Sequence, residues 1–274
     1  MQQIIYAVLV SALTAILLGP LVIPLLKKLR FGQTERELGP KSHLPKAGTP
    51  TMGGIIMLAA ILLGTLAVCL NTGTGVTQFL NVELPFMQVS DAGVSGVMEL
   101  VLPALLVTFA YSLVGFLDDF IKVRYKRSQG LYAYQKIIGQ FGIALVLAIY
   151  ASRSPLVGTA LYLPFLGVEW ELGAFYIPFA IFVVISITNA VNLTDGLDGL
   201  ASGVSLIYTL TMAVIYMIMS QAAVFAGQVL YGASLSGMSI FAAAVAGTCL
   251  GFLRHNSYPA KVFMGDTGSL ALGG

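Results

Sequence analysis

The chain has 274 residues, of which 57% are hydrophobic and only 9% are charged, and its mean hydropathy is +0.89. Because soluble domains carry about 25% charged residues, this composition excludes an ordinary soluble enzyme and a disordered chain. A net charge of +2 is too balanced for a polyanion binder, so no nucleic-acid partner is expected. The composition indicates a polytopic membrane protein.

Seven apolar runs are long enough, or nearly so, to cross a bilayer. Little in them alternates with period two, and helices satisfy their own backbone within hydrocarbon, so we predict helices rather than a β-barrel. The predicted fold class is an all-α, polytopic transmembrane helix bundle with seven spans and the start of an eighth at 270–274. The seven runs are 4–26, 53–70, 100–117, 137–151, 175–191, 200–219 and 238–253. Cys69 and Cys249 lie inside these runs and are expected to be small buried hydrophobes rather than a disulfide.

The basic residues are concentrated in three of the predicted loops. The loops 27–52, 118–136 and 254–269 hold all 14 Lys and Arg residues except Arg153. Cytoplasmic loops of membrane proteins are enriched in Lys and Arg, so these loops are predicted to be cytoplasmic and Met1 to lie outside. The outside segments would then be 71–99, 152–174 and 220–237. Within 152–174, the stretch 161–175 holds Trp170 and is interpreted as a hairpin or an interfacial segment.

Asp118 and Asp119 end the third span on its predicted cytoplasmic side. Adjacent carboxylates at a helix C-terminus are disfavoured by the helix dipole and by each other. Either the pair begins a solvated loop, or a divalent cation or a basic partner lies nearby. Mg²⁺ prefers oxygen ligands and commonly joins one or two carboxylates to substrate phosphates, so a magnesium site is one of the two interpretations.

Four polar side chains recur every three residues around the end of the fifth span: Asn189, Asn192, Asp195 and Asp198. Neighbouring members would share a helical face, and Gly196 and Gly199 predict that the helix breaks here. An Asx-rich turn is the alternative. Amides at membrane depth usually face a cavity or a partner, which favours a functional site.

Two glycine-rich stretches precede predicted helices. Residues 265–269, Gly-Asp-Thr-Gly-Ser, come before the eighth run, where Asp266 or Thr267 is expected to cap the helix. A helix N-terminus behind glycines also suits an anion, and Asp266 adds a third carboxylate. Residues 46–54, which include Lys46 and Thr51, suit an anion as well but do not match the phosphate loop of nucleotide hydrolases.

The other basic residues are interpreted more simply. Four of them are expected to anchor the chain at anionic lipid rather than to take part in chemistry: Lys122, Arg124, Lys126 and Arg127. Lys136 is the better candidate for a phosphate site, and His43 and His255 are expected in solvated loops. All candidate groups fall on the predicted cytoplasmic face, which indicates metal-assisted chemistry on a phosphorylated substrate at the membrane surface.

The sequence closely resembles the phospho-N-acetylmuramoyl-pentapeptide transferases in four segments: 43–54 (HLPKAGTPTMGG), 117–120 (LDDF), 189–200 (NAVNLTDGLDGL) and 260–269 (AKVFMGDTGS). The paired aspartates and the Gly-Asp-x-Gly motif are shared by all polyprenyl-phosphate N-acetylhexosamine-1-phosphate transferases. The TPTMGG and NLTDGLDG stretches are more specific to this family.

The resemblance implies transfer of phospho-MurNAc-pentapeptide from UDP-MurNAc-pentapeptide to undecaprenyl phosphate. The products would be lipid I and UMP, with Mg²⁺ as cofactor, at the cytoplasmic face of the bacterial inner membrane. It implies catalytic roles for Asp118, Asp119, Asp266 and Lys136, and Mg²⁺ ligation by Asp266 and Asn192. The implied substrate-binding residues are Lys46, Thr51, Asn192, Asp195, Asp198, Asn256 and Phe263.

Members of this family have ten helices, a histidine-rich cytoplasmic loop and often a dimeric state. The chain is therefore expected to be a single transferase domain over 1–274 that is incomplete at its C-terminus, with a homodimer possible. Three alternatives stay open: a related transferase acting on UDP-GlcNAc or another UDP-amino sugar, a transporter built from broken helices, and an inactive partner-binding fragment. The specific motifs disfavour the first, and the position of the carboxylates at the membrane rim disfavours the second.

Overall fold

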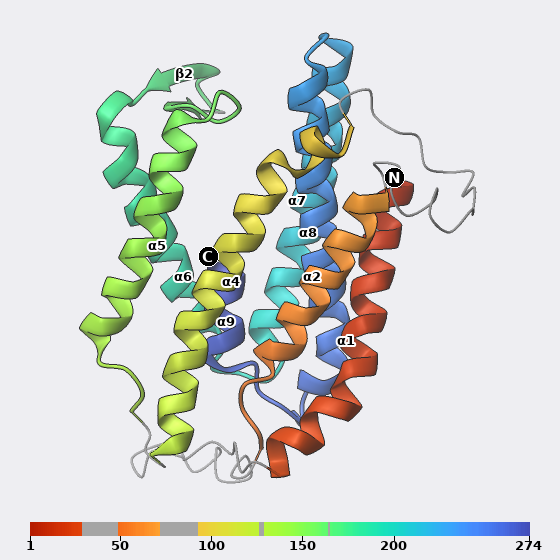
Figure 1. The fold of residues 1–274 in the computed structure, drawn as a ribbon, viewed down its shortest axis with the longest axis vertical. Coiled ribbons are helices and arrows are strands. Elements are labelled where there is room, and N and C mark those ends of the chain that lie inside the picture. Colours follow the sequence, from red (N-terminus) through yellow and green to blue (C-terminus); the bar gives the residue numbers. More distant parts are fainter. Residues whose placement is uncertain (29–48, 72–92, 126–128, 164) are drawn as a thin grey trace.

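The computed structural model describes residues 1–28, 49–71, 93–125, 129–163 and 165–274 (Figure 1). Its helices are α1 (Gln2–Lys28), α2 (Gly54–Asn71), α4 (Gly93–Arg124), α5 (Ala133–Arg153), the short 3₁₀ helix η2 (Gly173–Phe175), α6 (Tyr176–Thr194), α7 (Leu200–Phe225), α8 (Val229–Asn256) and α9 (Gly265–Gly273). The strands are β1 (Ala160–Leu163) and β2 (Val168–Glu171).

Apolar helices occur at all seven predicted runs. Among the described residues, six helices are long and apolar enough to cross a membrane, namely α1, α4, α5, α6, α7 and α8, and α2 is a shorter apolar helix. The described chain is almost entirely helical, which confirms the predicted all-α, polytopic fold class.

Three predicted boundaries are wrong. α7 and α8 are joined across 226–228 rather than by a loop at 220–237, because the Gly, Ala and Ser residues that dilute the hydropathy of this stretch are helical. α4 runs on to Arg124, so Asp118 and Asp119 lie within the helix rather than at its end. α9 begins at Gly265, so the Gly-Asp-Thr-Gly-Ser stretch is its first turn and not the segment before it.

α8 is the central helix of the bundle, and it packs against α1, α2, α4 and α7. In α8, 78% of the most apolar segment is buried, compared with 11% in α6 and in α7. Its contact with α1 is close because Gly247 and Gly251 lie on the backbone carbonyls of Val8 and Ala12, where any side chain would collide. Small residues four apart allow membrane helices to approach in this way. Cys69 and Cys249 are buried and do not form a disulfide, as predicted.

The segment between α5 and α6 is an antiparallel hairpin, which confirms the hairpin interpretation of 161–175. Leu161 lies opposite Trp170 in the register of β1 and β2. The hairpin lies at the end of the bundle where α5 ends and α6 begins (Figure 1). α4 carries Asp118 and Asp119 at the opposite end of the bundle.

Candidate active site

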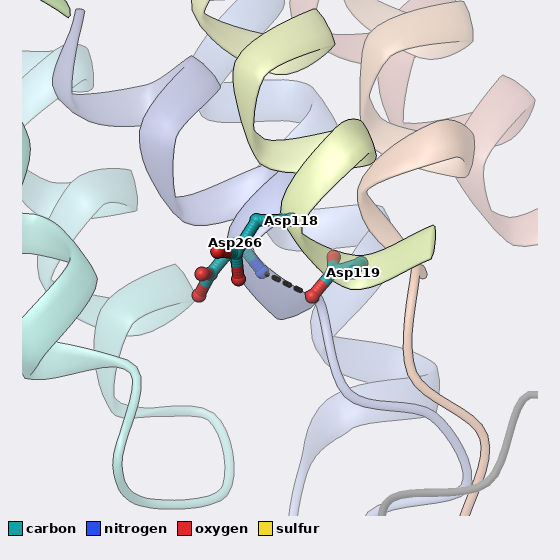
Figure 2. A group of neighbouring side chains, drawn as sticks. All are labelled: Asp118, Asp119 and Asp266. Carbon is teal, nitrogen blue, oxygen red and sulfur yellow. Dashed lines mark hydrogen bonds between the residues drawn. The ribbon is translucent and has the colours of Figure 1, made fainter. Parts of the chain in front are cut away.

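Three carboxylates gather where the last two turns of α4 meet the start of α9. Asp118 and Asp119 come from α4 and Asp266 from α9, and Figure 2 shows the three side chains lying together. One oxygen atom from each carboxylate lies within 4.8 Å of the others. Asp118 and Asp119 are only 3% and 2% exposed. Because buried carboxylates are stable only when paired or bound to a metal, this cluster requires a cation.

Two lysines supply positive charge to the cluster. Lys122 Nζ lies 2.5 Å from Asp118 Oδ2, 3.0 Å from Asp266 Oδ2 and 3.8 Å from Asp119 Oδ1. Lys136 Nζ donates a hydrogen bond of 2.7 Å to Asp266 Oδ2. The expectation that Lys122 serves only as a lipid anchor is wrong. It lies one turn beyond Asp118 on the same face of α4, a spacing that the predicted end of the helix at residue 117 concealed.

Asp266 is the electrostatic centre of the group. Burial opposes its ionisation, but its hydrogen bond with Asp118 and the charges of Lys122 and Lys136 outweigh burial and hold the pKa of Asp266 well below its usual range. Asp266 is therefore an anion at neutral pH, held between two ammonium groups.

Asp119 caps α9 from the neighbouring helix. Its carboxylate accepts hydrogen bonds from the backbone N–H groups of Asp266 (3.2 Å, Figure 2) and Thr267 (2.9 Å) and from the Thr267 hydroxyl (2.7 Å). A carboxylate here satisfies N–H groups that have no partner within the helix and complements the helix dipole. The expectation that Asp266 or Thr267 caps this helix is wrong, and Asp119, rather than an external anion, takes these two N–H groups.

Gly265 allows the close approach of α9 to α4. Its φ is +70°, and a Cβ atom there would lie 2.5 Å from Asp119 Oδ2 and 2.6 Å from Thr51 Oγ1. The same geometry puts Thr51 beside the carboxylates. Phe263 joins the segment before α9 to the segment before α2. Its N–H donates to the Pro50 carbonyl and its carbonyl accepts from the Gly53 N–H, each at 2.9 Å.

Asn192 extends the cluster to α6. Its Nδ2 donates to Asp266 Oδ1 at 2.8 Å and to Ser269 Oγ at 2.7 Å, and its Oδ1 accepts a longer bond, 3.5 Å, from Lys136 Nζ. Asn192 therefore orients the carboxylate of Asp266, and Lys136 contacts the same pair from α5.

A pair of hydrogen-bonded amides lies one turn deeper in the membrane than Lys136 and Asn192. Asn189 Nδ2 donates to Gln140 Oε1 at 2.7 Å, and Gln140 Nε2 donates back to Asn189 Oδ1 at 3.4 Å. Asn189 thus faces α5. Gln140, which is fully buried, was not among the predicted site residues, although an amide four residues after Lys136 in an apolar run is a detectable signal.

Asp195 and Asp198 lie in the break between α6 and α7, which confirms the predicted helix break. Burial, followed by the negative charges of Asp266 and Asp119, raises the pKa of Asp195 to about 8, although the N–H of Gly265 donates to it. Asp198 Oδ2 accepts a 3.1 Å bond from the Ala260 N–H. The break therefore contacts the segment between α8 and α9.

Asn256, at the end of α8, joins the same segments. Its Oδ1 accepts from the Gly199 N–H at 3.1 Å and from Ser202 Oγ at 3.2 Å, and its Nδ2 donates to the Val262 carbonyl at 3.0 Å. Both the oxygen and the nitrogen of the Asn256 amide are therefore hydrogen-bonded. In this structure Asn256 fixes the loops around Asp195 and Asp198.

The remaining candidates are Lys46 and the two histidines. Lys46 and His43 lie outside the described residues. His255 is only 7% exposed, its Nε2 lies 3.3 Å from the Ile16 carbonyl, and its ring packs on Gly19. The expectation of a solvated loop is wrong for His255, because α8 extends through it to Asn256.

Two family models match this chain. A family model described as "Glycosyl transferase family 4" matches residues 101–274, and one described as "Phospho-N-acetylmuramoyl-pentapeptide-transferase signature 1" matches residues 46–58. The chain belongs to the phospho-N-acetylmuramoyl-pentapeptide-transferase family. Members of this family are transferases that make lipid I in peptidoglycan synthesis.

Relatives named phospho-N-acetylmuramoyl-pentapeptide-transferase match this chain over nearly its whole length, and they include the three proteins that follow. The protein of Desulfitobacterium hafniense is 47% identical, over 100% of this chain and 73% of that protein. The Clostridioides difficile protein is 44% identical, over 99% of this chain and 72% of its own length. The Thermoanaerobacter sp. protein is 43% identical, over 100% of this chain and 73% of its own length. The signature match favours this family over a transferase for another UDP-amino sugar and over a transporter.

Proposed function

We propose that this chain transfers phospho-MurNAc-pentapeptide from its UDP carrier to undecaprenyl phosphate, forming lipid I and releasing UMP. The observation that carries the proposal is the cluster of three carboxylates and two lysines at one end of a membrane-spanning bundle of this family. The Lys and Arg residues are concentrated in the loops at that end, which supports a cytoplasmic active site with Met1 outside. The domain proposed to carry the reaction is the whole of 1–274.

The donor set fits Mg²⁺. Asp118, Asp119 and Asp266 direct oxygen atoms toward one another, and carboxylate oxygen atoms are ligands that Mg²⁺ prefers. Asn192 lies beside them with its Nδ2 toward Asp266, so it would offer its amide oxygen to an ion once the amide group is turned over. Lys122 demonstrates that positive charge is stable among these carboxylates. Asp266 and Asn192, with the paired aspartates, would hold the ion. When bound, the ion would neutralise the diphosphate and stabilise the leaving UMP.

The protein's own groups position and neutralise the reactants. Lys136 and Lys122 carry positive charge at the edge of the cluster, where they would bind phosphate oxygens of the donor and the lipid. Asn192 fixes the orientation of Asp266, and Asp119 keeps the start of α9 beside α4. Positioning and electrostatics dominate phosphoryl transfer. These groups are therefore enough to promote the reaction if the phosphate of the lipid attacks the diphosphate of the donor directly.

The nucleotide is proposed to lie beside the break between α6 and α7. Asp195 and Asp198 are the polar groups there, and Asn256 holds the loops that carry them. Thr51 and Phe263 lie on the segments that adjoin the carboxylates. Lys46 is proposed to bind the nucleotide by its position in the signature segment 46–58.

The test is Mg²⁺-dependent formation of lipid I from UDP-MurNAc-pentapeptide and undecaprenyl phosphate by the purified protein in detergent. Asp266→Asn and Lys136→Met should each lower turnover by about 10²–10³-fold, as expected when a group that stabilises transition-state charge is removed. Lys261→Met is the matched control, because Lys261 is exposed and its side chain belongs to none of the ion pairs of the cluster. Normal turnover by Asp266→Asn, or equal use of UDP-GlcNAc by the wild-type protein, would contradict the proposal.

A further inference from the structure

The hairpin of β1 and β2 joins two helices that are each long enough to cross a membrane. α5 ends at Arg153 and α6 begins at Tyr176, and both qualify as spans. A connection this short between two spans must lie at the membrane–water interface. It lies at the end of the bundle opposite the carboxylate cluster (Figure 1).

The two faces of the hairpin differ in polarity. Residues directly opposite in an antiparallel pair share a face, and neighbours along a strand alternate between faces. The register pairs Leu161 with Trp170 and Leu163 with Val168 on one face. It pairs Ala160 with Glu171 and Tyr162 with Glu169 on the other. We call the first set, Leu161, Leu163, Val168 and Trp170, the apolar face.

The described protein leaves the outer part of the apolar face uncovered. Trp170 is 58% exposed and Val168 is 50% exposed, and at the tip Phe165 and Leu166 are 101% and 72% exposed. A two-stranded hairpin by itself is marginally stable in water. This hairpin therefore needs an apolar surface or a membrane to cover Trp170, Val168 and the tip.

The surroundings point to lipid as that cover. Phe175 is 63% exposed beside the hairpin, Tyr150 is 38% exposed near the end of α5, and Arg153 is exposed at that end. Tyr and Trp are enriched at the headgroup level of membranes, and Arg side chains reach toward headgroups from helix ends. The two glutamates lie on the face that would remain in water.

We propose that the hairpin is an interfacial anchor that lays its apolar face and its tip into the headgroup region of the leaflet opposite the active site. Trp170 and Val168 enter the boundary between headgroups and acyl chains, while Glu169 and Glu171 face water. Amphipathic elements at a membrane surface bury their apolar face about 5–10 Å into the boundary between headgroups and acyl chains. The hairpin would act as this anchor whether or not the chain catalyses the proposed reaction.

The experiment uses the fact that Trp170 is the only tryptophan of the chain. The protein is reconstituted into vesicles of phosphatidylcholine and phosphatidylglycerol whose acyl chains are brominated at shallow or deep positions, and tryptophan fluorescence is recorded with a Trp170→Phe blank. We expect strong quenching by the shallow bromine atoms, weaker quenching by the deep ones, and poor quenching by aqueous acrylamide.

The matched control moves the tryptophan to the other face. In Tyr162→Trp/Trp170→Phe the fluorophore lies opposite Glu169 and should be quenched several-fold more by acrylamide and several-fold less by brominated lipid than Trp170. Equal quenching of the two proteins, or a Trp170 accessible to acrylamide and not to lipid, would overturn the proposal. A Trp170 shielded from both quenchers would also overturn it, by showing that protein covers the face.

Discussion

Replacing Gln140 with Leu should both destabilise the protein and slow its reaction. The buried residues of α5 are Gln140, Ala144 and Ala148, so the amide pair with Asn189 is the chief polar connection from α5 to α6. Lys136 lies one turn before Gln140, and Asn192 lies one turn after Asn189. A shift of α5 against α6 would therefore separate Lys136 and Asn192 from Asp266.

The size of the effect follows from the hydrogen bonds that are lost. The substitution removes bonds of 2.7 and 3.4 Å and leaves Asn189 with the Ile185 carbonyl at 2.8 Å. A hydrogen bond between membrane helices contributes about 0.6 kcal/mol on average, and a buried polar group left without its partner costs about 1–3 kcal/mol. We expect a loss of about 2 kcal/mol in the free energy of unfolding.

The assay is a double-mutant cycle with Gln140→Leu, Asn189→Leu and the double variant, measured by unfolding of the purified protein and by lipid I formation. Removing both amides leaves neither unpaired, so the double variant should lose about 1 kcal/mol less than the sum of the single variants. Val146→Leu, at a 70% exposed position of α5, is the control and should match wild type. Strictly additive losses, or single variants as stable as wild type, would refute the reasoning.

Two further predictions concern Asp195 and the packing of α2 on α9. The pKa of Asp195 is raised to about 8 from an ordinary value of about 4. Its protonation therefore stabilises the fold fully below about pH 4, and this contribution is lost as the pH rises through about 8. Asp195→Asn should consequently show a flatter decline of the unfolding temperature over that range, and identical slopes would contradict the assignment. Gly54→Ala should disrupt the bundle and abolish turnover, because a Cβ there would collide with the backbone of Gly268. Gly142→Ala, where a Cβ meets nothing within 4 Å, should be tolerated, and equal behaviour of the two variants in unfolding and turnover would show that the contact is not tight.

The positions of the spans could be predicted because they depend on local properties. An apolar run of sufficient length becomes a helix in hydrocarbon whatever its neighbours are, and helices occur at all seven runs. The ends of helices were less predictable. α8 begins at Val229, before the predicted 238, because Gly, Ala and Ser lower the hydropathy of its first turns while packing well against other helices.

The candidate carboxylates were also visible in the sequence, since Asp118, Asp119 and Asp266 are charges placed where a membrane helix does not favour them. Their individual contacts were not predictable. Asp119 caps a helix that begins 146 positions later in the chain, and nothing near Asp119 in the sequence indicates that partner. The fact that Lys122 turns into the cluster, rather than toward lipid, depends on α4 continuing past the apolar run.

By itself, the sequence determined that this is a helical membrane protein with acidic and basic groups concentrated at one end. Composition and apolar runs carry that information because the hydrophobic effect is non-directional and acts on each apolar residue whatever its partner is. Only the tertiary structure decided which lysine neutralises which carboxylate, that His255 is buried against α1, and that Gln140 joins α5 to α6. Those contacts depend on the distance and orientation between helices, which are set by the small residues on the faces where the helices meet.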